Sequence, residues 1–139
     1  MIAPPYRGPV ATLRYAVVGT GMMGTEHATT IRALPGAHLA ALCDPEPQSL
    51  ARVASALGDG APPAWRDVDR MLADVDPDVV VVASPNHTHD EVLRPVLAHG
   101  AHVLVEKPLA ITAARCAAVR EAAAATEPRA GREIGRAHV

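Results

Sequence analysis

The sequence is nearly devoid of aromatic side chains. Of its 139 residues only Trp65, Tyr6 and Tyr15 are aromatic, and phenylalanine is absent. Since 49% of the residues are nevertheless hydrophobic, the core has to be built from valine, leucine, isoleucine and especially alanine. Side chains this small favour helices packed closely on a sheet over a wide sandwich of two sheets, and the length favours one domain of ordinary size.

A surplus of charge of one sign is also missing. The formal net charge is -2, and no long run of like charges occurs, which excludes the basic surface typical of nucleic-acid-binding proteins. The longest apolar run, Val79 to Ala83, is far too short to span a bilayer, and residues 1–15 hold no apolar segment of signal-peptide length. We therefore expect no nucleic-acid partner, no membrane association and a cytoplasmic location.

Cysteines and metal-binding patterns are equally scarce. The two cysteines, Cys43 and Cys116, lie far apart without the spacing of metal ligands, so we expect free thiols in a reducing cytosol. His87 and His89 are two residues apart, do not share a helix face and have no third ligand nearby. The sequence therefore predicts no metal site, and a neutral imidazole is favoured at the start of a helix.

Short apolar segments alternate with segments of helical spacing along the chain. Four consecutive valines at 79–82 predict a strand that is buried on both faces, as in a parallel sheet. The pair Thr88 and Glu91 has the spacing of a capping box, and Gly58 is expected to close a helix. We expect strands at 13–18, 38–43, 64–65, 78–84 and 102–105, and helices at 22–34, 47–57, 67–72, 88–100 and 112–125. This alternation predicts an α/β fold with a doubly wound parallel sheet and right-handed crossovers.

A glycine-rich segment, Gly19-Thr20-Gly21-Met22-Met23-Gly24, joins the first expected strand to the first expected helix, which is the context a G-x-G-x-x-G motif requires. Its glycines would allow a tight turn, a close approach to a pyrophosphate and close helix–strand packing, with helix N-terminal amides facing the phosphates. Asp44, twenty residues after Gly24, could accept from both adenosine ribose hydroxyls and would repel a 2′-phosphate. The pattern favours NAD over NADP; a glycine turn with a surface Asp-Pro turn is the alternative.

Two further polar segments, Ser84-Pro85-Asn86 and Glu106-Lys107-Pro108, follow expected strands. Loops at the carboxyl ends of parallel strands border the ligand crevice. Lys107 is the only lysine beside twelve arginines, and its compact ammonium, held by the restricted backbone before Pro108, offers what an arginine does not. A purely structural turn and a solvated charge pair at a sheet edge are the alternatives for these two segments.

Taken together, GTGMMG, Asp44-Pro45, SPNHTH and AHGAHVLVEKPLA resemble the N-terminal half of the Gfo/Idh/MocA family (glucose–fructose oxidoreductase / inositol 2-dehydrogenase), from about Leu13 to Thr126. The resemblance implies a Rossmann-type NAD(P)-binding domain at 13–126 after a lead-in at 1–12. It also implies that Lys107 is catalytic, because the family's lysine helps to position cofactor and substrate and to tune proton transfer. The cofactor-binding positions that it implies are Gly19, Gly21, Met22, Met23 and Gly24 at the pyrophosphate, Asp44 at the adenosine ribose, Ser84, Asn86 and His89 beside the cofactor, and Glu106 and Lys107 near the nicotinamide ribose.

The function implied by this resemblance is hydride transfer between a nicotinamide cofactor and a secondary alcohol of a sugar, inositol or related polyol. The family's second α/β domain, which lines the substrate site, supplies a catalytic histidine and usually forms a dimer interface, has no counterpart here. We therefore expect a fragment, truncated after the fifth strand–helix unit, that binds dinucleotide weakly and is inactive alone, from a full-length homo-oligomer. A stand-alone dinucleotide-binding or redox-sensing module and a different two-domain reductase of the same fold are the alternatives.

The end of the chain, EIGRAHV, resembles a translated sequencing adapter, because one set of codons for it, GAG ATC GGA AGA GCA CAC GTC, contains a common adapter sequence. We hypothesise that the reading frame ran from a genomic insert into an adapter. Residues 127–139 would then be non-native or disordered and without function. A genuine polar C-terminus is the alternative, and the parent DNA distinguishes the two.

Overall fold

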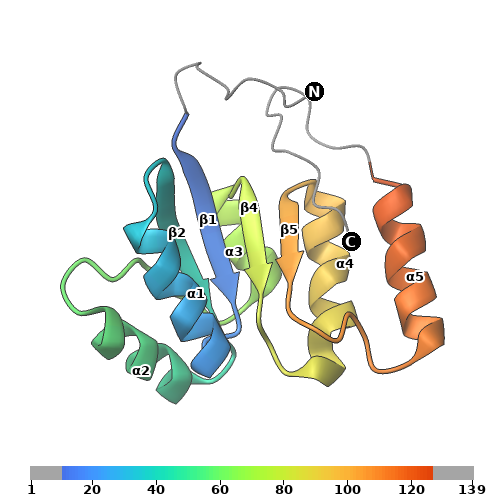
Figure 1. The fold of residues 1–139 in the computed structure, drawn as a ribbon, viewed down its shortest axis with the longest axis horizontal. Helices are drawn as coiled ribbons and strands as arrows, with labels where there is room; N and C mark the ends of the chain where they lie inside the picture. The colour runs from blue at the N-terminus through green and yellow to red at the C-terminus, as the bar shows by residue number, and fades with distance from the viewer. Residues whose placement is uncertain (1–10, 127–139) are drawn as a thin grey trace, which may run out of the picture.

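Five parallel strands form one sheet in the order β3-β2-β1-β4-β5. Figure 1 shows β2, β1, β4 and β5 side by side in this order. The computed structural model describes residues 11–126, so the expectations for residues 127–139 and for most of the lead-in lie outside the described residues. The strands are β1 (Leu13–Val18), β2 (Ala37–Cys43), β3 (Ala64–Trp65), β4 (Val79–Val82) and β5 (His102–Val105). The predicted α/β fold, a Rossmann-type parallel sheet, is confirmed.

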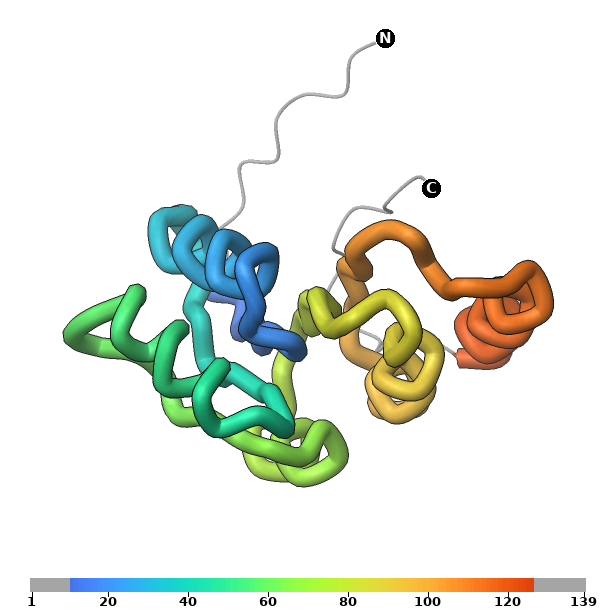
Figure 2. Tube along the Cα trace, turned by 90° about the horizontal axis from the view of Figure 1, so that it is seen from below, coloured from blue at the N-terminus to red at the C-terminus, as the bar shows by residue number. Residues whose placement is uncertain are grey.

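Helices cover both faces of this sheet, as Figure 2 shows from below. One face carries α1 (Met22–Ala33) and α2 (Pro47–Leu57), and the other carries α3 (Val68–Val75) and α4 (His89–His99). The last helix, α5 (Ala113–Ala124), packs mainly against α4. Within residues 11–126 no helix is long and apolar enough to cross a bilayer.

The core consists of two apolar layers, one on each face of the sheet. Alternate residues of β1 and β4 enter opposite layers, because side chains along a strand point alternately to its two sides. The layer under α3 and α4 contains Ala16, Val18, Val80, Val82, Met71, Leu72, Leu93 and Val96; the layer under α1 and α2 contains Val17, Val81, Leu39, Leu42, Ala28, Ile31 and Val53. All four valines of β4 are buried, as the sequence predicted.

The helix boundaries agree with the sequence prediction to within one residue, apart from two larger differences. The predicted helix 67–72 continues to Val75, because Leu72 and Val75 are both buried on its inner face. The predicted capping box is wrong: a 3₁₀ turn, η1 (Asn86–Thr88), precedes α4, and Thr88 makes no side-chain cap. Thr88 already has a helical backbone, and its hydroxyl lies 2.7 Å from the Pro85 carbonyl oxygen, whereas a capping residue needs an extended backbone. Gly58 closes α2 as expected, with a φ of 67°.

Candidate functional site

A crevice of about 790 Å³ opens at the carboxyl ends of β1, β2 and β4. From β1 the sheet continues to β2 on one side and to β4 on the other, so the crevice lies at the topological switch point, where open α/β sheets bind ligands. Its volume is in the range of small-molecule and cofactor sites. Of the predicted cofactor-binding residues, those that line it are Gly19, Gly21, Met22, Met23, Asp44 and Ser84.

The three glycines of the motif occupy very different surroundings. Gly19 has a φ of 88°, and a Cβ there would lie 2.3 Å from the backbone nitrogen of Ser84. A Cβ on Gly24 would lie 1.8 Å from the carbonyl oxygen of Gly19, so α1 could not approach the glycine loop. A Cβ on Gly21 would meet nothing within 4 Å. The fold therefore requires the first and third glycines, whereas the second keeps open a space that the protein does not use.

The N-terminal end of α1 is unoccupied by the protein's own acceptors. Its N-cap residue is Gly21, no side chain caps it among the described residues, and its first turn holds no acid. By contrast, α2 and α3, which also begin at the crevice, are capped by Glu46 and Asp67, and α4 begins with two acids. Helix N-terminal amides attract anions, so this end of α1 is suited to a phosphate group.

Asp44 joins the end of β2 to the glycine loop. Its Oδ2 accepts from the Thr20 backbone nitrogen at 2.8 Å and from the Thr20 hydroxyl at 3.1 Å, and its Oδ1 accepts from the Glu46 nitrogen at 2.9 Å. These three hydrogen bonds fix the orientation of a carboxylate that also lines the crevice. Asp44 is thus placed to accept hydroxyl groups of a ligand without moving.

The charged lining of the crevice is mostly acidic. The guanidinium of Arg66 is held by a 3.1 Å hydrogen bond from its Nε to the Pro45 carbonyl oxygen. The charged residues that share the lining with it are Asp44, Glu46, Asp67, Asp69 and Glu91. Cys43 lies at the same wall, where burial, and next the charges of Asp44 and Asp67, raise the pKa of its thiol to about 12. The Cys43 thiol is therefore neutral, and the carboxylates of Asp44 and Asp67 lie close to it in the lining of the crevice.

The remaining predicted site residues lie outside the lining of the crevice. Gly24 is buried beneath the glycine loop, and Asn86 is exposed at the start of η1. His89 is 0% exposed, with Nδ1 at 2.7 Å from the Pro108 carbonyl oxygen and Nε2 at 2.8 Å from the Ser84 carbonyl oxygen. His89 therefore connects two loops of the site rather than opening onto the crevice, and its direct contact with a cofactor stays a prediction.

Glu106 and Lys107 follow β5. The Glu106 nitrogen donates to the Val82 carbonyl oxygen at 2.9 Å, which extends the pairing of β4 and β5, and the Lys107–Pro108 peptide bond is cis. Glu106 Oε1 lies 2.5 Å from Nε2 of His27 on α1. This hydrogen bond, more than the nearby Lys107, holds the pKa of Glu106 below its ordinary value of 4.5. Lys107 itself is exposed.

Sequence reasoning missed Thr20 and His27. Thr20 occupies an unspecified position of the glycine motif, so nothing marked it as the partner of Asp44. His27 stands three residues after Gly24, on the same face of α1, and this helical spacing was the one available signal. Its partner Glu106 is 79 residues away, a contact that only the sheet topology brings about. The structure describes no cluster of three or more histidine, cysteine or acidic residues that could hold a metal in residues 11–126.

Comparison with known proteins gives consistent matches. Residues 13–131 match the sequence profile of the Gfo/Idh/MocA oxidoreductase family, NAD-binding Rossmann fold. Inositol 2-dehydrogenase 1 of Saccharopolyspora erythraea is 42% identical over 106 residues, which are 76% of this chain and 31% of that protein. A 2,7-anhydro-N-acetylneuraminate hydratase of Mediterraneibacter gnavus is 33% identical over 76% of this chain and 27% of the hydratase.

Solved structures agree with these sequence matches. The scyllo-inositol dehydrogenase of Lactobacillus casei, determined with bound NAD(H) and scyllo-inositol, is similar with a TM-score of 0.73 and 29% identity, over 81% of this chain and 33% of that one. The chain thus spans about a third of the length of these relatives.

Proposed function

The chain belongs to the Gfo/Idh/MocA oxidoreductase family with an NAD-binding Rossmann fold, and from this membership we propose that residues 13–126 are the cofactor-binding domain of a polyol or sugar dehydrogenase. NAD is the cofactor of this fold. The substrate class that we propose is an inositol, a sugar or a related polyol, as in the names of the dehydrogenases to which the chain is similar.

The free N-terminal end of α1 carries this proposal. We place the pyrophosphate of NAD at the backbone amides of Gly21, Met22 and Met23, because this end lacks both a cap and an acid and because the Gly21 side of the loop is open. Asp44, already oriented by Thr20, accepts the hydroxyls of the adenosine ribose. The acidic lining of the crevice disfavours the 2′-phosphate of NADP. The residues present therefore fit NAD.

Lys107 takes the catalytic role in this proposal. When bound, NAD supplies a nicotinamide ring that accepts or returns a hydride. Lys107 follows the carboxyl end of β5. In this proposal its ammonium donates hydrogen bonds to the cofactor ribose and to the substrate hydroxyl and tunes the transfer of the hydroxyl proton. We propose that turnover also needs a substrate domain, because the chain covers only 31% of inositol 2-dehydrogenase 1, and that the chain alone binds NAD without turning over substrate.

Two glycine variants test the cofactor site. Gly21→Ala fills the open side of the loop without meeting any protein atom, so we expect at least a tenfold weaker NAD affinity, equivalent to about 1.4 kcal/mol. Because alanine is a poorer N-cap residue than glycine, the free energy of unfolding should fall, but by no more than about 1 kcal/mol. Gly24→Ala forces α1 away from the loop, so we expect it to lower the free energy of unfolding by about 1–3 kcal/mol. Titration calorimetry with NAD and urea unfolding measure both effects. NAD binding by Gly21→Ala at the affinity of the unmodified protein would contradict the proposed site.

The role of Lys107 is tested in a protein extended to the natural end of its gene. Lys107→Ala should lower turnover more than it lowers NAD affinity, because the lysine acts on the reacting groups while the glycine loop and Asp44 hold the cofactor. Steady-state kinetics with a panel of inositols and sugars, together with NAD titration, separate the two quantities. Unchanged turnover would contradict the catalytic assignment.

A further inference from the structure

We propose that His27 and His89 are positioning residues that hold the segment Glu106–Pro108 from two sides and thereby fix Lys107 next to the loop of Ser84, which lines the crevice. This inference deepens the proposed function and rests on it for the role of Lys107. The two histidines come from different helices, and they bind the residues immediately before and after the lysine.

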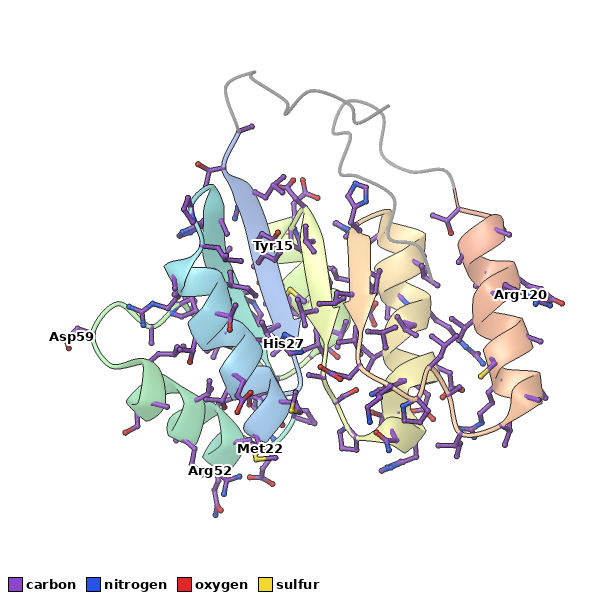
Figure 3. The ribbon with its side chains drawn as sticks, in the orientation of Figure 1. Tyr15, Met22, His27, Arg52, Asp59 and Arg120 are labelled. Carbon is purple, nitrogen blue, oxygen red and sulfur yellow. The ribbon has the colours of Figure 1, made fainter. Side chains whose placement is uncertain are left out.

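The first anchor is the hydrogen bond from Nε2 of His27 to Oε1 of Glu106, at 2.5 Å. Figure 3 shows His27 on the side of α1 that is turned toward β4 and β5. Both side chains are about three-quarters buried, at 25% and 26% exposed, so water competes little for this contact. Because α1 begins at the glycine loop, the bond connects the segment before Lys107 to the helix that we assign to the pyrophosphate.

The second anchor is the ring of His89. It is fully buried at the start of α4, and its two nitrogens face the carbonyl oxygens of Pro108 and Ser84. The ring therefore spans from the loop after β4 to the loop after β5. A carbonyl oxygen only accepts, so the ring binds both loops when each of its nitrogens carries a hydrogen. Displacing the Pro108 carbonyl would then leave a buried N–H without an acceptor, which is costly.

Lys107 lies between these anchors with a free head group. Among the described residues, no hydrogen bond or ion pair holds its ammonium, so the position of the lysine is set by its backbone. A flexible lysine on a mobile loop would lose rotational and positional freedom when it engages a ligand. Fixing the two neighbouring residues removes part of that cost and leaves the ammonium available to cofactor and substrate.

A third histidine pair provides the matched control. His99 Nε2 lies 2.9 Å from Asp76 Oδ1, a contact of similar kind between α4 and the end of α3. His99 and Asp76 lie at the C-terminal ends of α4 and α3, whereas the crevice lies at the N-terminal ends of these helices. If the two anchors merely stabilise the fold, removing this pair should have the same effect on Lys107 as removing His27.

The lone lysine makes a direct measurement possible. Protein grown with ¹⁵N-lysine has one labelled backbone amide, that of Lys107, and its NMR order parameter reports the rigidity of this position. We expect an order parameter of about 0.85 in the ligand-free protein and below roughly 0.6 in His27→Ala. His27→Gln keeps a donor for Glu106 and should restore rigidity, and His99→Ala should leave it unchanged. An equally rigid Lys107 in His27→Ala, or equal loosening in His99→Ala, would overturn the role of His27.

The role of His89 needs a separate experiment, because the substitution of a fully buried residue can prevent folding. His89→Gln, where it folds, should loosen Lys107 as His27→Ala does. In the unmodified protein, a ring N–H of His89 should exchange slowly with water because it is buried against a carbonyl oxygen. Rapid exchange of that N–H, or a rigid Lys107 in folded His89→Gln, would remove His89 from the proposal.

NAD titration keeps the two proposals apart. Addition of NAD should shift the Lys107 amide signal in the unmodified protein, and the shift should be smaller in His27→Ala while calorimetry still detects binding through the glycine loop. Absence of binding to the unmodified protein would contradict the proposed function. The ligand-free order parameters would still decide whether the two histidines hold Lys107.

Discussion

At the scale of single residues, Asp44 combines a structural task with the ligand-binding task that we propose for it. Its carboxylate holds the glycine loop through Thr20 and lines the crevice at the same time. A residue that orients a loop and also accepts a ligand hydroxyl couples the shape of the pyrophosphate site to the ribose site. Substitution of Asp44 consequently has two effects that an experiment has to separate.

Asp44→Asn keeps an oxygen acceptor and removes the charge. Hydrogen bonds to a charged acceptor are worth about 1–2 kcal/mol more than neutral ones, so we expect NAD affinity to fall about tenfold and the preference over NADP to narrow. Calorimetric titration with both dinucleotides measures this change. Thr20→Val is the control, because it removes one hydrogen bond of the loop and leaves the carboxylate in place. An unaltered ratio of the two dissociation constants would show that Asp44 does not select the cofactor.

Glu106 gives a pH-dependent contribution to stability whose sign follows from its lowered pKa. Because the hydrogen bond from His27 lowers the pKa in the folded state, the contribution is present above the ordinary value of 4.5 and is lost as the pH falls through the lowered pKa. Glu106→Gln, compared with the unmodified protein by urea unfolding from about pH 7 to about pH 3, should thus differ most at neutral pH. The two proteins should converge at the acidic end, and a constant difference over the whole range would contradict the assignment.

The residues that sequence analysis could predict are those whose partners are close in the chain or at a set spacing. The glycine motif and Asp44 belong to this group, since a strand, a turn and a second strand determine where they meet. The partners of His27 and His89 belong to loops far along the chain, 79 and 19 residues away. No local pattern encodes such a contact, because it depends on which strands become neighbours.

At the scale of secondary-structure elements, the helices differ in which groups accept hydrogen bonds from the free backbone amides of their first turn. Asp67 caps α3 by accepting from the Arg70 nitrogen at 2.8 Å, and Thr112 caps α5 in the same way. The start of α4 shows why capping is hard to predict: Thr88 and Glu91 have the right spacing, yet η1 has already turned the chain into a helical conformation. Whether a side chain caps a helix depends on the backbone angles of that residue, and the residue type does not determine those angles.

Asp67→Ala and Glu91→Ala test this difference between predicted and observed caps. Loss of the Asp67 cap should lower the free energy of unfolding by about 1 kcal/mol. Glu91→Ala removes an exposed carboxylate that caps nothing, so we expect a loss below about 0.5 kcal/mol. Urea unfolding of both variants gives the comparison. An equal loss in the two variants would restore the capping box at Thr88 and Glu91.

At the scale of the whole molecule, the crevice is shared by two parts of the sheet. The glycine loop follows β1, Asp44 follows β2 and Arg66 follows β3, while Ser84 follows β4 on the other side. The segment of Lys107 follows β5 and is joined to Ser84 through His89. The alternation of strands and helices predicted a doubly wound sheet, but more than one strand order satisfies that description. The order β3-β2-β1-β4-β5 and the position of α5 against α4 emerge only from the packing of the complete set of elements.

Binding across both parts should stabilise the molecule as a unit. At a free NAD concentration of about 100 times the dissociation constant, mass action adds about 2.7 kcal/mol to the free energy of unfolding. For a domain of this size we expect the melting temperature to rise by roughly 10 °C. Thermal unfolding followed by circular dichroism measures the rise, with NADP at the same concentration as the control. A melting temperature that does not respond to NAD would contradict binding at the crevice.

The central place of β1 also determines a sequence of events during synthesis. β1 leaves the ribosome before the other described strands and can pair with β2 soon afterwards, but its other neighbour, β4, is made only after α2, β3 and α3. At about 5–20 residues per second, the nascent chain spends on the order of several seconds with β1 open on one edge. For that time the backbone N–H and C=O groups of Ala16 to Val18 that later pair with β4 are unpaired, and the apolar side chains beside them are uncovered. Chaperones or other nascent chains can bind there, because the cofactor site has not yet formed.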